Sequence, residues 1–241
     1  MAKITHLALL CAVVILGMLI PPVMAAEAAP GEHLYRGFDY AQNRPDIDGN
    51  VIVWEDNRNG QMDIYSGTID GFRGSLGYTG ERITTDPNSQ EKPSISGNHI
   101  VWQDNRSGNW DIYLYDRSSK NDIQITTGPG KHWLPAISGN YVAWYHKNNG
   151  RTNIALYDIT EKKVIDVIDC DARTTIPGAS TEFKPALSEK YIAWVEDTDA
   201  RIRYYDIAAG KTIGPVSAST AVQCWPSLSG SLITWEDYRG G

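Results

Sequence analysis

Hydrophobic and polar positions alternate in short runs along most of this 241-residue chain. In residues 111–116, DIYLYD, two aliphatic side chains alternate with two tyrosines, and in residues 141–144, YVAW, Val142 and Trp144 share one side with Ala143 opposite. A period of two with β-branched and aromatic residues is typical of β-strands. The runs end at Gly, Asn, Asp and Ser, which favour turns. The pattern predicts an all-β fold.

These runs belong to a repeat. Five segments align without gaps, and in each a proline stands nine residues before a tryptophan: 45–54 PDIDGNVIVW, 93–102 PSISGNHIVW, 135–144 PAISGNYVAW, 185–194 PALSEKYIAW and 226–235 PSLSGSLITW. Each complete unit continues with a strand such as DIYLYD and closes with one such as DIQIT at 122–126. Four short strands in roughly 45 residues are typical of one blade of a β-propeller.

The repeat sets the expected domain organisation. A β-propeller domain is predicted over 33–241, with repeat cores at 45–87, 93–127, 135–168, 185–214 and, as a partial unit, 226–241. About five blades of four strands are visible, the last of them incomplete. The segment His33–Tyr40 precedes the first repeat proline at the offset at which Glu81–Asn88 precedes the second. It is therefore expected to be an outermost strand that closes the last blade.

The first residues have the pattern of an export signal. One lysine, Lys3, precedes the apolar run Leu7–Ile20, which is shorter than the roughly 20 residues of a membrane span and suits a signal peptide. Small residues before Ala26 offer a cleavage site, so 1–25 is predicted as signal peptide and 26–32 as a short leader. A secreted or cell-surface protein without a transmembrane span after cleavage is expected; an uncleaved anchor stays open.

Composition excludes several classes of protein. With 41% hydrophobic and 21% charged residues the chain is too apolar to be disordered, and a net charge of −7 argues against a nucleic-acid partner. The sequence contains no phosphate-binding loop, no G-x-S-x-G motif and no spacing of zinc ligands, so neither a cofactor nor a metal is expected.

The full unit, P-x-[IL]-S-G-N-x-[IV]-[VA]-W-x-D-N-R-x-G-x-x-D-I-Y-x-Y-D, resembles the TolB-like propeller repeat, most closely the version found in tandem in archaeal cell-surface proteins. Three places depart from it: Glu189 replaces a glycine, His146 replaces the aspartate, and Arg201–Tyr204 replaces the D-I-Y core. The resemblance implies a non-catalytic interaction scaffold of the cell envelope. Its expected partners are a cell-envelope or surface protein, or a polysaccharide.

Aromatic residues outside the repeat are the candidate ligand-binding residues. Five of the eight tryptophans occupy the repeat position. Strand parity places the loops between blades and the hairpins between second and third strands on one face, which carries Trp110, Trp133, Phe183 and Trp225. Such side chains could stack on sugar rings or grip a peptide. Alternatively, they plug the channel or pack under neighbouring blades.

Carboxylates also gather in the hairpins, for example Asp104 and Asp111. Capping of their own turns is a simpler interpretation than calcium binding, which stays open. Five-bladed propellers also host glycoside hydrolases, which need two convergent carboxylates. Asp46 and Asp171 could meet, but serine or alanine replaces Asp46 in the other repeats, so no catalytic residue is expected. A glycoside-hydrolase-like enzyme and a purely architectural surface-layer component are the alternatives.

Two cysteines, Cys170 and Cys224, remain after removal of the signal peptide. In an oxidising compartment they could form a disulfide. Two buried free thiols are the alternative.

Overall fold

The computed structural model describes residues 41–70, 80–148, 150–175 and 182–239. The predicted signal peptide 1–25, the leader 26–32 and the closing strand His33–Tyr40 lie outside the described residues. Within the described ranges, no helix has the length and apolar character that crossing a membrane requires.

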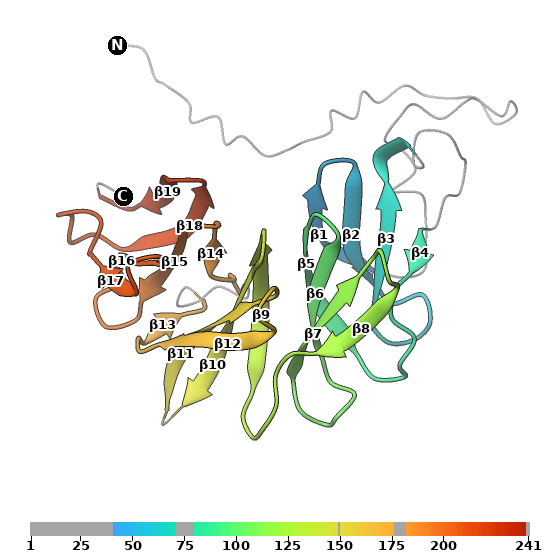
Figure 1. Cartoon of the computed structure of the whole chain (residues 1–241). Coiled ribbons are helices and arrows are strands. Elements are labelled where there is room, and N and C mark those ends of the chain that lie inside the picture. Colours follow the sequence, from blue (N-terminus) through green and yellow to red (C-terminus); the bar gives the residue numbers. More distant parts are fainter. Residues whose placement is uncertain (1–40, 71–79, 149, 176–181, 240–241) are drawn as a thin grey trace, which may run out of the picture.

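The strands follow the repeat in chain order, and each sheet is one blade (Figure 1). Blade one contains β1 (Gln42–Asp48), β2 (Val51–Asp56), β3 (Asp63–Thr68) and β4 (Glu81–Arg82). Blade two contains β5 (Gln90–Ser96), β6 (His99–Asp104), β7 (Asp111–Asp116) and β8 (Asn121–Gln124). Blade three contains β9 (His132–Ser138), β10 (Tyr141–Asn148), β11 (Arg151–Asp158) and β12 (Lys163–Ile168).

Blade four departs from this plan because its first strand is split. Both β13 (Ala172–Arg173) and β14 (Ala186–Leu187) pair with β15 (Tyr191–Glu196), which is followed by β16 (Ile202–Asp206) and β17 (Lys211–Ile213). Blade five has two strands in the described residues, β18 (Gln223–Ser229) and β19 (Leu232–Asp237). All these pairings are antiparallel, and the prediction of an all-β propeller with four-stranded blades is confirmed.

The core lies between neighbouring blades. Trp102, Trp144 and Trp194 are 0%, 2% and 1% exposed, and each packs with side chains of the preceding blade. Trp102, for example, clusters with Val53 and Ile64 of blade one. The repeat tryptophan therefore joins one blade to the next, which explains why the sequence keeps it in every unit.

A β-bulge recurs at the start of the first strand. The register shifts at the repeat proline and the residue before it in blades one, two, three and five. The preceding residue adopts a left-handed conformation, with φ of 51° at Arg44, 58° at Lys92, 54° at Leu134 and 46° at Trp225. This region is unfavourable for residues with a Cβ. A bulge bends the strand and redirects a side chain, so the repeat places one redirected residue near the same end of each of these four blades.

Candidate functional site

The bulges surround one cavity of about 340 Å³, and all five blades contribute to its lining. The residue before each repeat proline takes part in every blade: Arg44, Lys92, Leu134, Lys184 and Trp225. Asp46, Glu182 and Phe183 complete the charged and aromatic part of the wall. We call this space the channel mouth, because the first strands of blades one, two, three and five and the loop before β14 line it.

Ion pairs cross the channel mouth from blade four. Lys184 Nζ lies 3.0 Å from Asp46 Oδ2 of blade one and donates to Ser94 Oγ of blade two at 2.9 Å. Ser94 Oγ in turn donates to Asp46 Oδ2 at 2.6 Å. A second pair joins Lys92 Nζ and Glu182 Oε2 at 3.0 Å. The loop before β14 is therefore fixed to the first strands of blades one and two by charge and hydrogen bonds.

The bulges themselves are supported from the neighbouring second strand. Lys92 donates its backbone N–H to Glu55 Oε1 at 2.6 Å, and Leu134 donates its N–H to Gln103 Oε1 at 3.0 Å. Glu55 and Gln103 occupy the same repeat position, directly after the tryptophan. Burial raises the pKa of Glu55, an effect that the Lys92 N–H and the Arg44 guanidinium oppose. A backbone N–H that the bulge removes from the hydrogen bonds between strands thus donates to a side-chain oxygen. The N–H of Lys92 and that of Leu134 are therefore both paired.

The structure brings together two of the four aromatic candidates. Phe183 and Trp225 both line the channel mouth, Phe183 being buried and Trp225 38% exposed. Trp133 is buried instead, with its ring 5.9 Å from that of Tyr145 between blades three and four. Trp110 is half-buried outside the channel mouth, where its carbonyl accepts a hydrogen bond from the His132 N–H at 2.9 Å. The site therefore has one accessible tryptophan.

Sequence reasoning missed the charged residues of this site. Arg44, Lys92 and Lys184 each stand immediately before a repeat proline, a position that the alignment of the five segments leaves out because it starts at the proline. The available signal was that three of the five residues before a repeat proline are basic.

The hairpin carboxylates bind groups of their own blade. Asp104 Oδ2 accepts hydrogen bonds from Trp102 Nε1 at 2.8 Å and Arg106 Nη2 at 2.7 Å, and Asp104 Oδ1 accepts from the Arg106 N–H at 2.9 Å. Asp56 has the corresponding partners in blade one. These contacts are the turn capping that the sequence favoured over calcium.

The two carboxylates considered for catalysis lie in different places. Asp46 lines the channel mouth, whereas Asp171 lines a separate cavity beside Thr152 and Arg173, where its Oδ1 accepts the Thr152 N–H at 3.1 Å.

Of the two alternatives for the cysteines, the structure has buried free thiols at both Cys170 and Cys224. The physical reason is their placement on different blades. Cys170 follows β12 and packs in the core between blades three and four, where its thiol lies 3.5 Å from the Thr152 carbonyl. Cys224 lies in β18 opposite Glu236 of β19.

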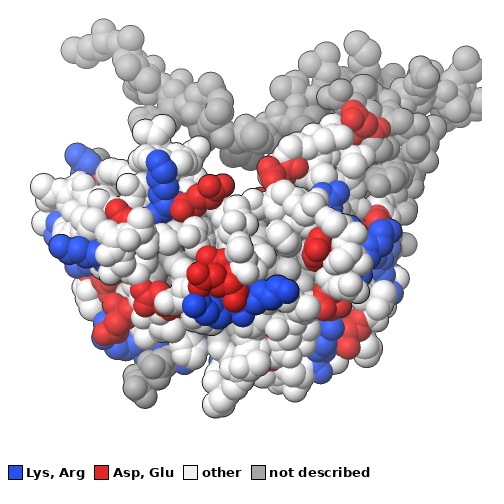
Figure 2. All heavy atoms as spheres, in the orientation of Figure 1, with Lys and Arg blue, Asp and Glu red and all other residues white. Residues whose placement is uncertain are grey.

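Positive and negative side chains are interspersed on the face that Figure 2 shows. No single sign of charge dominates that face, which agrees with the modest net charge of −7.

Comparison with solved structures identifies other propellers. The chain is similar to TolB from Acinetobacter baumannii, with 18% identity and a TM-score of 0.52 over 70% of this chain and 41% of that one. It is also similar to a puromycin-hydrolyzing peptidase from Mycobacterium tuberculosis, with 12% identity and a TM-score of 0.51 over 73% of this chain and 28% of that one. At such identities the likeness shows the β-propeller fold, shared by TolB and by peptidases.

The chain spans less than half the length of either protein. No protein-family model matches the sequence, and no curated protein matches it.

Proposed function

We propose that this protein is a non-enzymatic β-propeller that binds a partner protein or a polysaccharide at the channel mouth. The observation that carries the proposal is the meeting of all five blades around one cavity with an accessible tryptophan. Trp225 keeps a left-handed backbone conformation at 38% exposure. Strain of this kind persists where the surrounding structure enforces it, and it is concentrated at binding sites.

The charges of the channel mouth favour binding over hydrolysis. Asp46 is engaged by Lys184 and Ser94, and Glu182 is engaged by Lys92. A glycoside hydrolase needs one protonated and one free carboxylate on either side of the bond. Paired carboxylates and ammonium groups instead offer hydrogen bonds to the backbone of a peptide or to sugar hydroxyls, while Trp225 offers a ring face.

The predicted signal peptide 1–25 and the resemblance to tandem repeats of archaeal surface proteins support a place for this function outside the cytoplasm. The partner is then a cell-envelope or surface protein, or a polysaccharide. A purely architectural role in a surface layer is the second candidate, and it predicts contacts with copies of this chain instead of a soluble ligand.

An array of soluble polysaccharides and immobilised peptides tests the proposal. The wild-type protein should retain members of one class, and Trp225→Ala, Lys92→Ala and Lys184→Ala should each weaken retention while circular dichroism shows an unchanged fold. Trp110→Ala, in a half-buried loop away from the channel mouth, is the matched control and should bind as wild type. Hydrolysis of any polysaccharide on the array would overturn the non-enzymatic proposal.

A further inference from the structure

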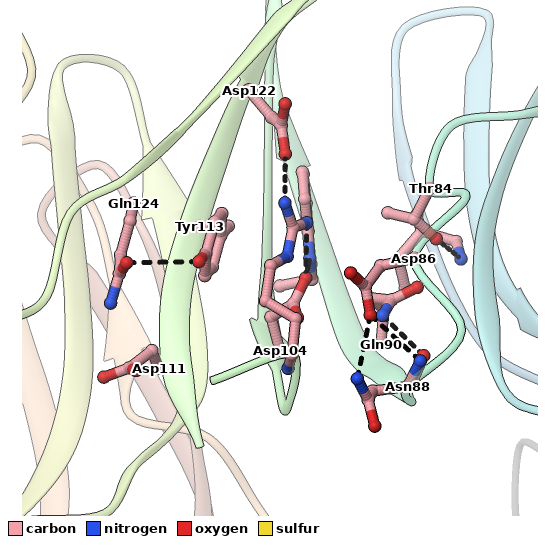
Figure 3. Close-up of polar contacts among 12 residues, drawn as sticks. Thr84, Asp86, Asn88, Gln90, Asp104, Asp111, Tyr113, Asp122 and Gln124 are labelled. Carbon is pink, nitrogen blue, oxygen red and sulfur yellow. Dashed lines mark hydrogen bonds and ion pairs between the residues drawn. The ribbon is translucent and has the colours of Figure 1, made fainter. Parts of the chain in front are cut away.

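Blades one and two each contain the same cluster of four side chains: a tryptophan, an aspartate, an arginine and a tyrosine. We call this cluster the clamp. In blade two, Trp102 and Tyr113 stack with ring centroids 6.1 Å apart, and the Arg106 guanidinium lies 4.0 Å from the tyrosine centroid. Asp104 joins the clamp by accepting from both Trp102 Nε1 and Arg106. Figure 3 shows Asp104 and Asp122 in this region and the hydrogen bond of 3.1 Å between the Tyr113 hydroxyl and Gln124 Oε1.

Blade one repeats this arrangement. Trp54 and Tyr65 stack at 6.0 Å, the Arg58 guanidinium lies 4.3 Å from the tyrosine centroid, and Trp54 Nε1 donates to Asp56 at 3.3 Å. The clamp therefore surrounds the repeat tryptophan in both of these blades.

Blade three has the tryptophan without its clamp. The strand register places Ala155 opposite Trp144, where Tyr113 lies opposite Trp102. Val167 lies opposite Ala155, where Gln124 lies opposite Tyr113. His146 takes the position of Asp104, two residues after the tryptophan. Three replacements thus remove a phenol ring, its hydroxyl partner and the acceptor of the indole N–H.

The replacements leave a cavity of about 160 Å³, lined by Trp144, His146, Ala155 and Val167 together with Ile125 and His132. An apolar cavity of about 150 Å³ is large enough to bind benzene. The wall combines the apolar residues with His132, His146, Thr126 and Thr127, and Val167, 47% exposed, opens the cavity to solvent.

Two buried polar atoms at this cavity have no hydrogen-bond partner in the described residues, Trp144 Nε1 and His146 Nδ1. The indole of Trp144 is 2% exposed. Unpaired buried polar groups are rare and need an explanation. His146 stacks on His132, with centroids 5.1 Å apart and an angle of 11° between the rings. Burial and the nearby His132 lower the pKa of His146, so its ring is neutral at pH 7.

We propose that the cavity of blade three binds a phenol group, whose ring fills the space of the missing tyrosine ring and whose hydroxyl is turned toward Trp144, unlike that of Tyr113, which is bonded to Gln124. The ring lies against the Trp144 indole and the apolar wall formed by Ala155, Val167 and Ile125. Its hydroxyl accepts a hydrogen bond from Trp144 Nε1–H and donates one to His146 Nδ1, which uses both unpaired atoms with the donor and acceptor capacity of one hydroxyl. The source is either a free phenolic compound or a tyrosine side chain of a partner protein.

Calorimetric titration of the full chain with phenol tests the proposal, with toluene as a probe of the same shape that lacks the hydroxyl. Phenol should bind, and toluene should bind about tenfold more weakly because it leaves both polar atoms unpaired. Equal affinity for the two probes would overturn the assignment of the hydroxyl site, and absence of phenol binding would overturn the proposal as a whole.

Three variants locate the bound ring. Ala155→Tyr rebuilds the residue of blades one and two and should abolish binding, and Val167→Trp, at an exposed position of the rim, should do the same if Ala155→Tyr does not fold. Ile123→Ala is the matched control, since Ile123 is 46% exposed on β8 and does not line the cavity. Phenol binding by a folded Ala155→Tyr or Val167→Trp variant with unchanged affinity would contradict the proposal.

N-acetyl-tyrosinamide separates the two sources. Binding comparable to that of phenol supports a tyrosine side chain as ligand, and its exclusion while phenol binds supports a free phenolic compound. This site is distinct from the channel mouth, so Trp225→Ala should leave phenol affinity unchanged.

Discussion

Trp102 and Trp144 occupy the same position of neighbouring repeats and differ in one hydrogen bond and in the residue opposite, Tyr113 for Trp102 and Ala155 for Trp144. Both are buried, at 0% and 2% exposure, and both pack against the preceding blade. Trp102 Nε1 donates to the buried carboxylate of Asp104 at 2.8 Å, whereas Trp144 Nε1 has no partner among the described residues. Replacement of each by phenylalanine therefore separates the hydrogen bond from the hydrophobic contribution.

The expected difference follows from the type of bond. Both substitutions remove the same part of a buried ring, and phenylalanine keeps a ring opposite Tyr113, so much of the apolar loss cancels in the comparison. Trp102→Phe also removes a hydrogen bond to a charged group, worth about 1.5–3 kcal/mol. Trp144→Phe removes an unpaired buried donor, which costs nothing and relieves a desolvation penalty. Trp102→Phe should therefore lower the free energy of unfolding by about 2 kcal/mol more than Trp144→Phe does.

Urea unfolding followed by circular dichroism measures this difference, provided that the slope with denaturant is the same for wild type and both variants. A double-mutant cycle with Asp104→Ala gives the coupling between Trp102 and Asp104 directly, and it should reproduce about 2 kcal/mol. Equal destabilisation by the two phenylalanine variants, or a greater loss from Trp144→Phe, would refute the argument that the clamp acts through the indole N–H.

Three further predictions concern charge and thiols. Burial alone would raise the pKa of Asp56, but hydrogen bonds from Arg58, Gln42 and Trp54 lower it, and a bond from Arg203 lowers the pKa of Asp199. These two carboxylates therefore stabilise the fold above about pH 4, and this contribution is lost as the pH falls through their lowered pKa. The urea midpoint should decline between pH 6 and pH 3, and it should decline less for Asp199→Asn. A midpoint that does not change with pH would contradict the shifts. Lys184→Met should cost no more than about 1 kcal/mol, because the pair with Asp46 is partly exposed at 43% and 29%; a much larger loss in thermal melts would show that the ion pair holds the blades together. Burial raises the pKa of Cys170 to about 12 and also raises that of Cys224, so Ellman's reagent should label both only after unfolding, and rapid labelling of the native protein would be inconsistent with two buried thiols.

The fold was predictable from the sequence because the pattern is repeated. Any single run such as YVAW is ambiguous, but a proline nine residues before a tryptophan in five segments fixes both the strands and their order. The burial of Trp54, Trp102, Trp144 and Trp194 follows from the same pattern, since a position kept in every blade meets similar neighbours.

The site was only partly predictable. Trp225 and Phe183 could be selected as aromatic residues outside the repeat, yet Trp133 satisfies the same criterion and is buried against Tyr145. What separates Trp225 from Trp133 is the bulge: it places Trp225 itself in a left-handed conformation before its proline, whereas in blade three Leu134 has that position. Phe183 stands two residues before its proline, as Trp133 does, but it lies in the loop before β14, where the first strand of blade four is split. Composition carries no information on either difference.

The cavity of blade three was signalled by one departure from the repeat. His146 in place of the aspartate is visible in the sequence, but the partners Ala155 and Val167 are recognised as replacements only when the strand register aligns them with Tyr113 and Gln124.

The central claim is that partners bind where the five blades meet, and one comparison tests it most directly. Wild-type protein and the triple variant Lys92→Ala, Lys184→Ala, Trp225→Ala are applied to the same polysaccharide and peptide array, with circular dichroism confirming that both are folded. The probes retained by the wild type should be lost by the triple variant. Retention of the same probes by a folded triple variant would contradict it.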